Sequence, residues 1–198
     1  MVVRHARARG LIDAAPAAAV DAAGLETRHV SAYFGLRRGG EGRRQRAWPK
    51  LTAVVHAHSH LILEAVPGVE PSQDSPDFTP AMPQAAGLGQ IDTVLGDVGY
   101  DAEHNHRLCR EDLSVRQTVI RLNRRNTGRR WPKTPYRRAM RRRFPKAPHN
   151  QRWHAESGFS QYKRRLGSAL TTRDNASQAR ELALRVLTHN LMLLAQIA

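Results

Sequence analysis

The sequence has little of what marks membrane or disulfide-stabilised proteins. It contains one cysteine, Cys109, so an internal disulfide is excluded and a reducing cytoplasm fits. No stretch approaches the ~20 apolar residues that a membrane-spanning helix needs. The opening residues MVVRHARARG hold no continuous apolar segment of the signal-peptide kind. We therefore expect a cytoplasmic protein without a membrane role.

Acidic residues are also scarce relative to basic ones. Lys and Arg number 32 against 17 Asp and Glu, which gives a formal net charge of +15. The excess is clustered, because the segment from Leu122 to Lys146 holds eleven Lys or Arg residues and no acid. Such a block favours nucleic acid or another polyanion as partner.

The chain is long enough for one domain, and 40% hydrophobic residues support a real core. We expect a single domain over residues 1–198 with a basic, Arg-rich arm at 122–148. Gly128, Pro132, Pro135 and Pro145 interrupt this arm, so the sequence predicts an extended or partly disordered segment. Trp131 lies inside the arm, where it would either stack on an exposed base or anchor the arm to the core.

Hydrophobic patterning predicts strands and helices in alternation. Strands are expected at 17–21, 51–56, 61–66, 91–95 and 114–120, the second and third forming a hairpin. Helices are expected at 1–12, 78–86, 101–111, around Glu156 and from Asn175 onward. Asp101 would cap the third helix, and Asn175 with Gln178 resembles a capping box. This order of elements predicts an α/β layer arrangement.

The most informative stretch is RWHAESGFSQYKRRLG. On a helix, Arg152, Glu156 and Lys163 fall within a narrow arc, because 4 and 11 residues are close to whole turns at about 3.6 residues per turn. An apolar stripe lies beside that arc, formed by Ala155, Phe159, Tyr162 and Leu166. A carboxylate on the border of this buried face suits a metal ion, and the two flanking cations suit a polyanion.

Two further acids, Asp21 and Asp97, end predicted strands, at the edge where ligands bind in open α/β sheets. Together with Glu156 they would form an oxygen site suited to Mg²⁺ or Mn²⁺. Two such ions about 4 Å apart would activate a water or 3′-hydroxyl and stabilise the leaving oxygen of a phosphodiester. An Asp at a strand end is also a common turn or cap residue, so the pattern alone leaves a structural role open.

Four stretches carry a family resemblance. They are AVDAAGLETRHVS around Asp21, PKLTAVV, LGDVGYDAEHNH around Asp97, and RWHAESGFSQYKRRLGSAL continuing to ALRVLTHNLMLL. Through them the chain resembles the catalytic domain of DDE transposases of bacterial insertion sequences, in the group with a Tyr-x-x-Arg-x-x-x-Glu-x-x-x-x-x-x-Lys signature. The resemblance implies an RNase H-like fold, a mixed five-stranded sheet flanked by helices. It also implies an enzyme that cleaves and transfers DNA strands, with Asp21, Asp97 and Glu156 as the catalytic triad that binds two Mg²⁺ or Mn²⁺ ions.

The same resemblance assigns DNA contacts. Arg152 and Lys163 would touch transposon-end DNA, and His149 stands at the signature's Tyr position. The basic arm, including Arg141, Arg142 and Arg143, would hold backbone phosphates. The implied partners are transposon ends and target DNA, with a homodimer on DNA left open, and the implied location is the nucleoid within the cytoplasm.

The chain departs from the family pattern at three places. His149 keeps a ring but lacks the phenol, and Ala22-Ala23 follow Asp21 where a hydroxyl residue is common. Barely 16 residues precede the first predicted strand, whereas such transposases normally begin with a helical DNA-binding region. A truncated, inactive copy or one piece of a longer enzyme is therefore among the expectations. Two alternatives stay open: a non-catalytic DNA-binding remnant, and an RNA-binding basic protein with no catalytic site.

Overall fold

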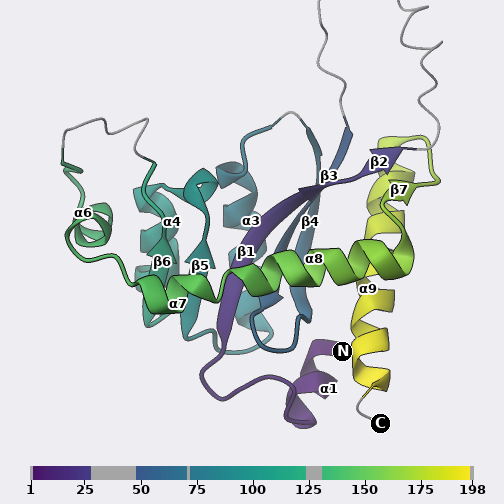
Figure 1. Cartoon of the computed structure of the whole chain (residues 1–198), viewed down its shortest axis with the longest axis horizontal. Helices are drawn as coiled ribbons and strands as arrows, with labels where there is room; N and C mark the ends of the chain where they lie inside the picture. The colour runs from purple at the N-terminus through teal and green to yellow at the C-terminus, as the bar shows by residue number, and fades with distance from the viewer. Residues whose placement is uncertain (1, 28–47, 71, 124–130, 197–198) are drawn as a thin grey trace, which may run out of the picture.

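A mixed sheet forms the centre of the computed structural model, which describes residues 2–27, 48–70, 72–123 and 131–196. The sheet has five strands in the order β4-β3-β1-β5-β6 (Figure 1). Their bounds are β1 Ala17–Gly24, β3 Trp48–His56, β4 Ile62–Glu70, β5 Thr93–Gly96 and β6 Gln117–Ile120. Strand β3 runs antiparallel to both β4 and β1, whereas β1, β5 and β6 run parallel to one another. This RNase H-like architecture confirms the predicted fold class.

Helices cover both faces of the sheet. They are α1 Val2–Ala8, α3 Ser75–Gly87, α4 Glu103–Arg107, α6 Pro135–Arg142, α7 Lys146–Asn150, α8 Trp153–Leu166 and α9 Asn175–Ala195, with short turns η1 Val98–Tyr100 and η2 Leu108–Asp112. Helix α8 crosses one face of the sheet, and α3 and α4 lie on the other (Figure 1). A small second sheet pairs β2 (Glu26–Thr27) with β7 (Ala169–Leu170). Among the described helices, none is long and apolar enough to cross a membrane.

The alternation of side chains along β1 separates two apolar cores. Ala18 and Val20 belong to the cluster that contains Phe78 of α3, whereas Ala19 packs in the cluster that contains Phe159 of α8. Residues two apart share a face of a strand. Asp21 therefore points to the same side as Ala19, toward α8.

The predicted strands and the hairpin are confirmed, with one correction at Asp21. This residue was expected to end its strand, but β1 continues to Gly24. The reason is the length of its neighbour: β3 offers partners for three more residues, and Gly24 pairs with Lys50. Asp21 pairs with Ala53 of β3, whereas the pairing of β1 with β5 ends one residue earlier, at Val20.

Both predicted helix caps are wrong in detail. Ala102 occupies the N-cap position of α4, while the Asp101 carboxylate accepts hydrogen bonds from the Arg137 guanidinium, both at 2.8 Å. The cap of α9 lies one residue earlier than predicted, because Asp174 accepts from the Ser177 amide at 2.9 Å and Asn175 is already helical.

The prediction of an extended or partly disordered arm is wrong over residues 135–142 and 146–150, which form α6 and α7. A carboxylate from another helix stabilises the start of α6. Glu103 accepts hydrogen bonds from the amides of Tyr136 and Arg137, each at 3.0 Å, so two N–H groups without intrahelical partners are satisfied. Residues 124–130 of the predicted arm lie outside the described residues.

Candidate functional site

Asp21 and Asp97 lie beside each other because their strands are parallel neighbours. Val20 of β1 pairs with Gly96 of β5, and each Asp is the next residue along its strand. Burial raises the pKa of Asp21, and a hydrogen bond from the Ala22 amide at 3.0 Å opposes that shift. The negative charges of Asp97 and Glu156 raise this pKa further. The fold thus brings Asp97 and Glu156 within electrostatic reach of Asp21.

Arg152 connects two of these carboxylates. Its Nη1 lies 3.2 Å from Oδ2 of Asp21, and its Nη2 lies 2.5 Å from Oε1 of Glu156. The guanidinium side chain is 18% exposed and the Glu156 side chain 58%, so the cation is enclosed while one carboxylate faces solvent. A single Arg therefore balances charge that would otherwise repel.

A divalent ion fits the chemistry of this donor set, since three clustered carboxylates offer hard oxygen ligands and gain from a shared cation. The arrangement of the described side chains, however, contains no group of three or more His, Cys, Asp or Glu residues placed to hold a metal ion. Arg152 bridges Asp21 and Glu156 instead. The ligand roles of Asp21, Asp97 and Glu156 stay a prediction.

Helix α8 runs alongside β1, and polar side chains near both of its ends contact that strand. Besides Arg152, Lys163 donates from Nζ to the Gly24 carbonyl at 2.9 Å. Three residues of the predicted apolar stripe, Ala155, Phe159 and Tyr162, are at most 6% exposed, and the fourth, Leu166, is partly buried. The expected helix with its narrow polar arc is confirmed, and both cations of that arc lie against the strand that carries Asp21.

His149 lies at the end of α7, close to the turn that carries Asp97. Burial lowers its pKa, and the nearby Arg152 lowers it further, while a hydrogen bond to the Gly96 backbone opposes the shift. Its ring meets Phe144 edge-on, with ring centroids 4.9 Å apart. His149 is therefore neutral at pH 7 and offers hydrogen bonding rather than charge.

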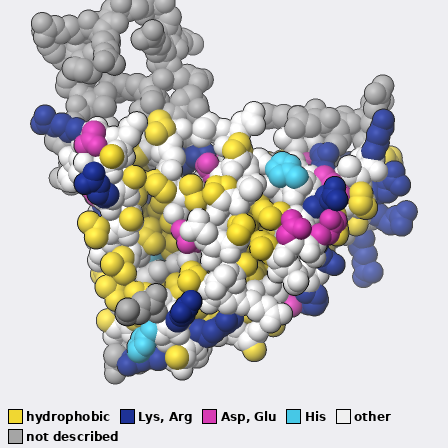
Figure 2. Space-filling model, turned by 180° about the vertical axis from the view of Figure 1, so that it is seen from behind, with side chains coloured by type: hydrophobic (Ala, Val, Ile, Leu, Met, Phe, Trp, Pro, Cys, Tyr) yellow, Lys and Arg dark blue, Asp and Glu magenta, His cyan; other side chains and the backbone are white. Residues whose placement is uncertain are grey.

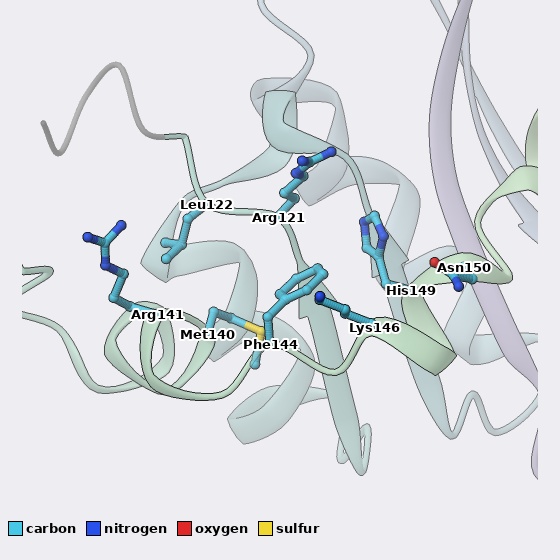
Figure 3. Close-up of a pocket in the computed structure, with 8 residues that line it drawn as sticks. All are labelled: Arg121, Leu122, Met140, Arg141, Phe144, Lys146, His149 and Asn150. Carbon is cyan, nitrogen blue, oxygen red and sulfur yellow. The ribbon is translucent and has the colours of Figure 1, made fainter.

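A cationic pocket of about 360 Å³ opens next to His149 (Figure 3). Figure 3 shows Phe144 and Lys146 at its centre, Arg141 on one side, and His149 with Asn150 on the other. Arg121 lines it as well, and Leu122 and Met140 add apolar surface. None of the pocket's three cations forms an ion pair with a described carboxylate. The pocket thus combines unpaired positive charge with an aromatic and apolar lining.

The three arginines predicted to bind phosphates differ in placement. Arg141 is half-buried, lines the pocket and lies over the Trp131 ring, 5.8 Å from its centroid. Arg142 and Arg143 are exposed at the end of α6. Lys and Arg side chains crowd the edge of the molecule around α6, on the right in Figure 2. The Trp131 side chain is 56% exposed. This exposure disfavours the alternative in which Trp131 anchors the arm to the core.

Sequence reasoning missed a buried polar network behind β1. Lys50 on β3 is fully buried, and its Nζ lies 2.9 Å from Asp77 and 3.3 Å from Asp74. Asp74 presses on the turn after Asp97, since a Cβ at Gly99 would lie 3.0 Å from Oδ2 of Asp74. This network therefore packs against the turn that follows Asp97. Its signal in the sequence is the placement of Lys50 and Thr52 within the largely apolar run PKLTAVV.

Comparison with known families agrees with this geometry. The model of the family described as the transposase DDE domain matches residues 13–191, from before β1 to the last turns of α9. The match includes Asp21, Asp97 and Glu156. No curated protein matches the chain. Since the family model covers most of the sequence, the chain belongs to the DDE transposase domain family.

Proposed function

We propose that the chain, as a single domain, cleaves DNA and transfers strands in a reaction that depends on Mg²⁺ or Mn²⁺. The observations that support this proposal are the adjacency of Asp21 and Asp97 on the parallel strands β1 and β5, the Arg152 link from Asp21 to Glu156, and the nearby cationic pocket. Burial alone does not require such a cluster. Three carboxylates that repel one another are costly unless a cation joins them.

The three carboxylates would be the ligands of the metal. Two bound divalent ions supply an activated water or 3′-hydroxyl at neutral pH and stabilise charge on the leaving oxygen. Arg152 keeps the carboxylates of Asp21 and Glu156 together while they are unliganded. If another cation neutralises the carboxylates of Asp21 and Glu156, the planar guanidinium of Arg152 would be free to make a bidentate contact with a phosphate.

The α6–α7 region would hold the DNA backbone. Arg121, Arg141 and Lys146 present unpaired positive charge at the pocket, and Arg142 and Arg143 extend it along the surface. Trp131 offers an exposed ring on which a base can stack. His149, whose ring donates to the Gly96 backbone, would hold the α7 end of this surface beside the Asp97 turn.

Glu156→Gln tests the catalytic role. It keeps the side chain's shape but removes the charge that holds the ion, so we expect Mg²⁺-dependent nicking of duplex DNA to be lost. Binding to the same duplex should persist or tighten slightly, because one negative charge near the phosphates is gone. The stabilisation of the fold by Mg²⁺ should shrink in parallel.

The matched control is Glu111→Gln, an exposed carboxylate on η2 that pairs with Arg107 at 3.1 Å and should change none of these readouts. A second candidate function is favoured by the Arg152 bridge, which satisfies the carboxylates without a metal: a DNA-binding domain with no catalysis. Unmodified chain that neither gains stability from Mg²⁺ nor cuts DNA would favour this second function.

A further inference from the structure

Two histidine rings that are far apart in the sequence meet beside α8. Nε2 of His60, in the turn between β3 and β4, lies 3.2 Å from Nδ1 of His154 near the start of α8. The ring planes are tilted by 43° and their centroids are 5.4 Å apart, so the contact joins ring nitrogens rather than stacked faces. On a helix, residues 154 and 156 point about 160° apart. This histidine pair is therefore separate from Glu156 and the other clustered carboxylates.

The amide of Gln161 holds the other nitrogen of the His60 ring. Gln161 follows His154 by seven residues, so both lie on one side of α8. Its Nε2 lies 2.9 Å from Nδ1 of His60, while its buried Oε1 has no hydrogen-bond partner among the described residues. A half-turn of the amide exchanges these two atoms. Oε1 would then accept the proton of Nδ1, and Nε2 of His60 would direct its lone pair toward His154.

The fold also fixes the backbone of His60. Its φ of 60° lies in the left-handed region, which residues other than Gly seldom adopt. The His60 amide donates to the His56 carbonyl at 3.0 Å, and Nε2 of His189 donates to the His60 carbonyl at 3.1 Å. Gly158 lets α8 approach this turn closely, because a Cβ there would lie 3.2 Å from Cγ1 of Val55 and 3.7 Å from the Cβ of His60. Strained conformations that the surroundings hold in place are frequent at functional sites.

The separation of the two ring nitrogens suits a transition-metal ion. Zn–N bonds of about 2.0–2.1 Å in tetrahedral geometry place two ligand nitrogens about 3.4 Å apart. Imidazole nitrogens suit Zn²⁺, Cu²⁺ and Ni²⁺, whereas Mg²⁺ prefers oxygen ligands. A hydrogen bond to the second ring nitrogen, as Gln161 would make, orients histidine ligands in metal sites. We propose that His60 and His154 bind a Zn²⁺ ion that joins the β3–β4 turn to α8.

The remaining ligands of this ion would come from the cavity beside His60. The cavity has a volume of about 470 Å³ and is also lined by His58, Asp13 and Arg165. Among the described side chains, no group of three or more ligand residues is already placed around a metal ion. Water would therefore complete the coordination, or His58 would do so after its exposed side chain turns toward the ion.

Calorimetric titration of the full chain with Zn²⁺ tests the proposal. Glu156→Gln and an excess of Mg²⁺ remove the contribution of the carboxylates, and in this background we expect one Zn²⁺ per chain and a higher melting temperature. Adding His60→Asn or His154→Gln should weaken Zn²⁺ binding by about tenfold or more, and Gln161→Leu by about tenfold. Asn tolerates the left-handed backbone, so His60→Asn should leave the metal-free melting temperature nearly unchanged.

The matched control is His104→Gln, which replaces an exposed histidine on α4 and should bind Zn²⁺ like its parent. The proposal is overturned if the parent binds no Zn²⁺, or if binding persists in both the His60 and the His154 variants. An equal loss in the His104 variant also overturns it, because the ion would then be bound by surface histidines in general. These titrations contain no DNA and measure no cleavage, so the zinc site and the catalytic function stand or fall separately.

Trp153 reports where the ion binds. Its ring stacks on the His154 ring, with centroids 3.9 Å apart and planes tilted by 26°. With Trp48→Phe and Trp131→Phe it becomes the one tryptophan of the chain. Cu²⁺ favours the same imidazole ligands and should quench its fluorescence. His154→Gln should abolish this quenching at the same Cu²⁺ concentration, and unchanged quenching in that variant would place the ion elsewhere and contradict the site.

Discussion

Positively charged side chains are placed differently at the two ends of this molecule. At the α6–α7 end, cations without described ion-pair partners surround a pocket with an aromatic lining. At the α9 end, Arg185 donates hydrogen bonds to the carbonyls of Gly167 and Ala169 and forms an ion pair with Glu181. The comparison shows that net charge says little until its placement is known. It also implies that salt weakens DNA binding at the first end.

The largest effect is expected from removing charge at the cationic end. Replacing Arg141, Arg142 and Arg143 with Ala should weaken binding to duplex DNA and flatten the slope of log affinity against log salt by about 0.9 for each lost phosphate contact. Arg107→Ala, which removes an exposed cation on α4, serves as control. An unchanged slope in the triple variant would show that this end does not touch the DNA backbone.

A smaller effect is expected from loosening the cationic end without changing its outward charges. Arg137 holds α6 to α4 through the Asp101 carboxylate, whose side chain is fully buried. Arg137→Met leaves that carboxylate without its ion-pair partner and should destabilise the fold by about 2 kcal/mol, measured by urea denaturation. DNA affinity should fall while the salt slope stays nearly constant, because the surface arginines remain. Arg138→Met, which removes bonds only to the carbonyls of Pro132 and Lys133, should cost much less.

The smallest effect is expected at the base of α9, where Glu181 joins that helix to the preceding turn. Burial disfavours its charged form, but hydrogen bonds from Thr172 and Thr171 and the charge of Arg185 outweigh this and lower its pKa from 4.5 to about 2. A depressed folded-state pKa stabilises the protein above the unfolded value, and this stability is lost as pH falls from about 4.5 toward 2.

Thermal melts across that pH range should reveal the contribution. Glu181→Gln should lower stability at pH 7 by about 1 kcal/mol and make the melting temperature less sensitive to pH between 4.5 and 2. Glu26→Gln on β2 is a control, since this carboxylate is exposed. Parallel pH profiles for the unmodified chain and the Glu181 variant would show that Glu181 does not anchor α9.

Several features of the candidate site follow from local sequence alone. The apolar stripe of α8 is buried as its periodicity predicts, and this fixes the direction of Arg152, Glu156 and Lys163 relative to the core. The position of each Asp after an apolar strand segment places both at one region of the sheet. These predictions succeed because burial of apolar surface depends on a repeat that is visible within a few turns or strand residues.

The sequence carries a local signal for the start of α6, but the prolines of this segment favoured the prediction of an extended arm. Thr134 followed by Pro135 is a favourable helix beginning, since Pro suits the first turn. The carboxylate of Glu103 that completes this beginning comes from a helix more than thirty residues away. The local sequence is thus compatible with α6, and hydrogen bonds to Glu103, which is distant in sequence, stabilise its start.

The amino-acid sequence by itself determined which faces of the helices and strands are apolar, the hairpin, and the charge imbalance. The tertiary structure decided which charges meet: Arg152 with Asp21 across 131 residues, Lys50 with Asp77, and Arg137 with Asp101. Among the described residues, it also leaves several large apolar side chains of α9 exposed. The physical reason is the sequence separation over which each feature is determined. Hydrophobic periodicity is a property of neighbouring residues. An ion pair between distant residues depends on strand order and helix placement, which no local segment encodes.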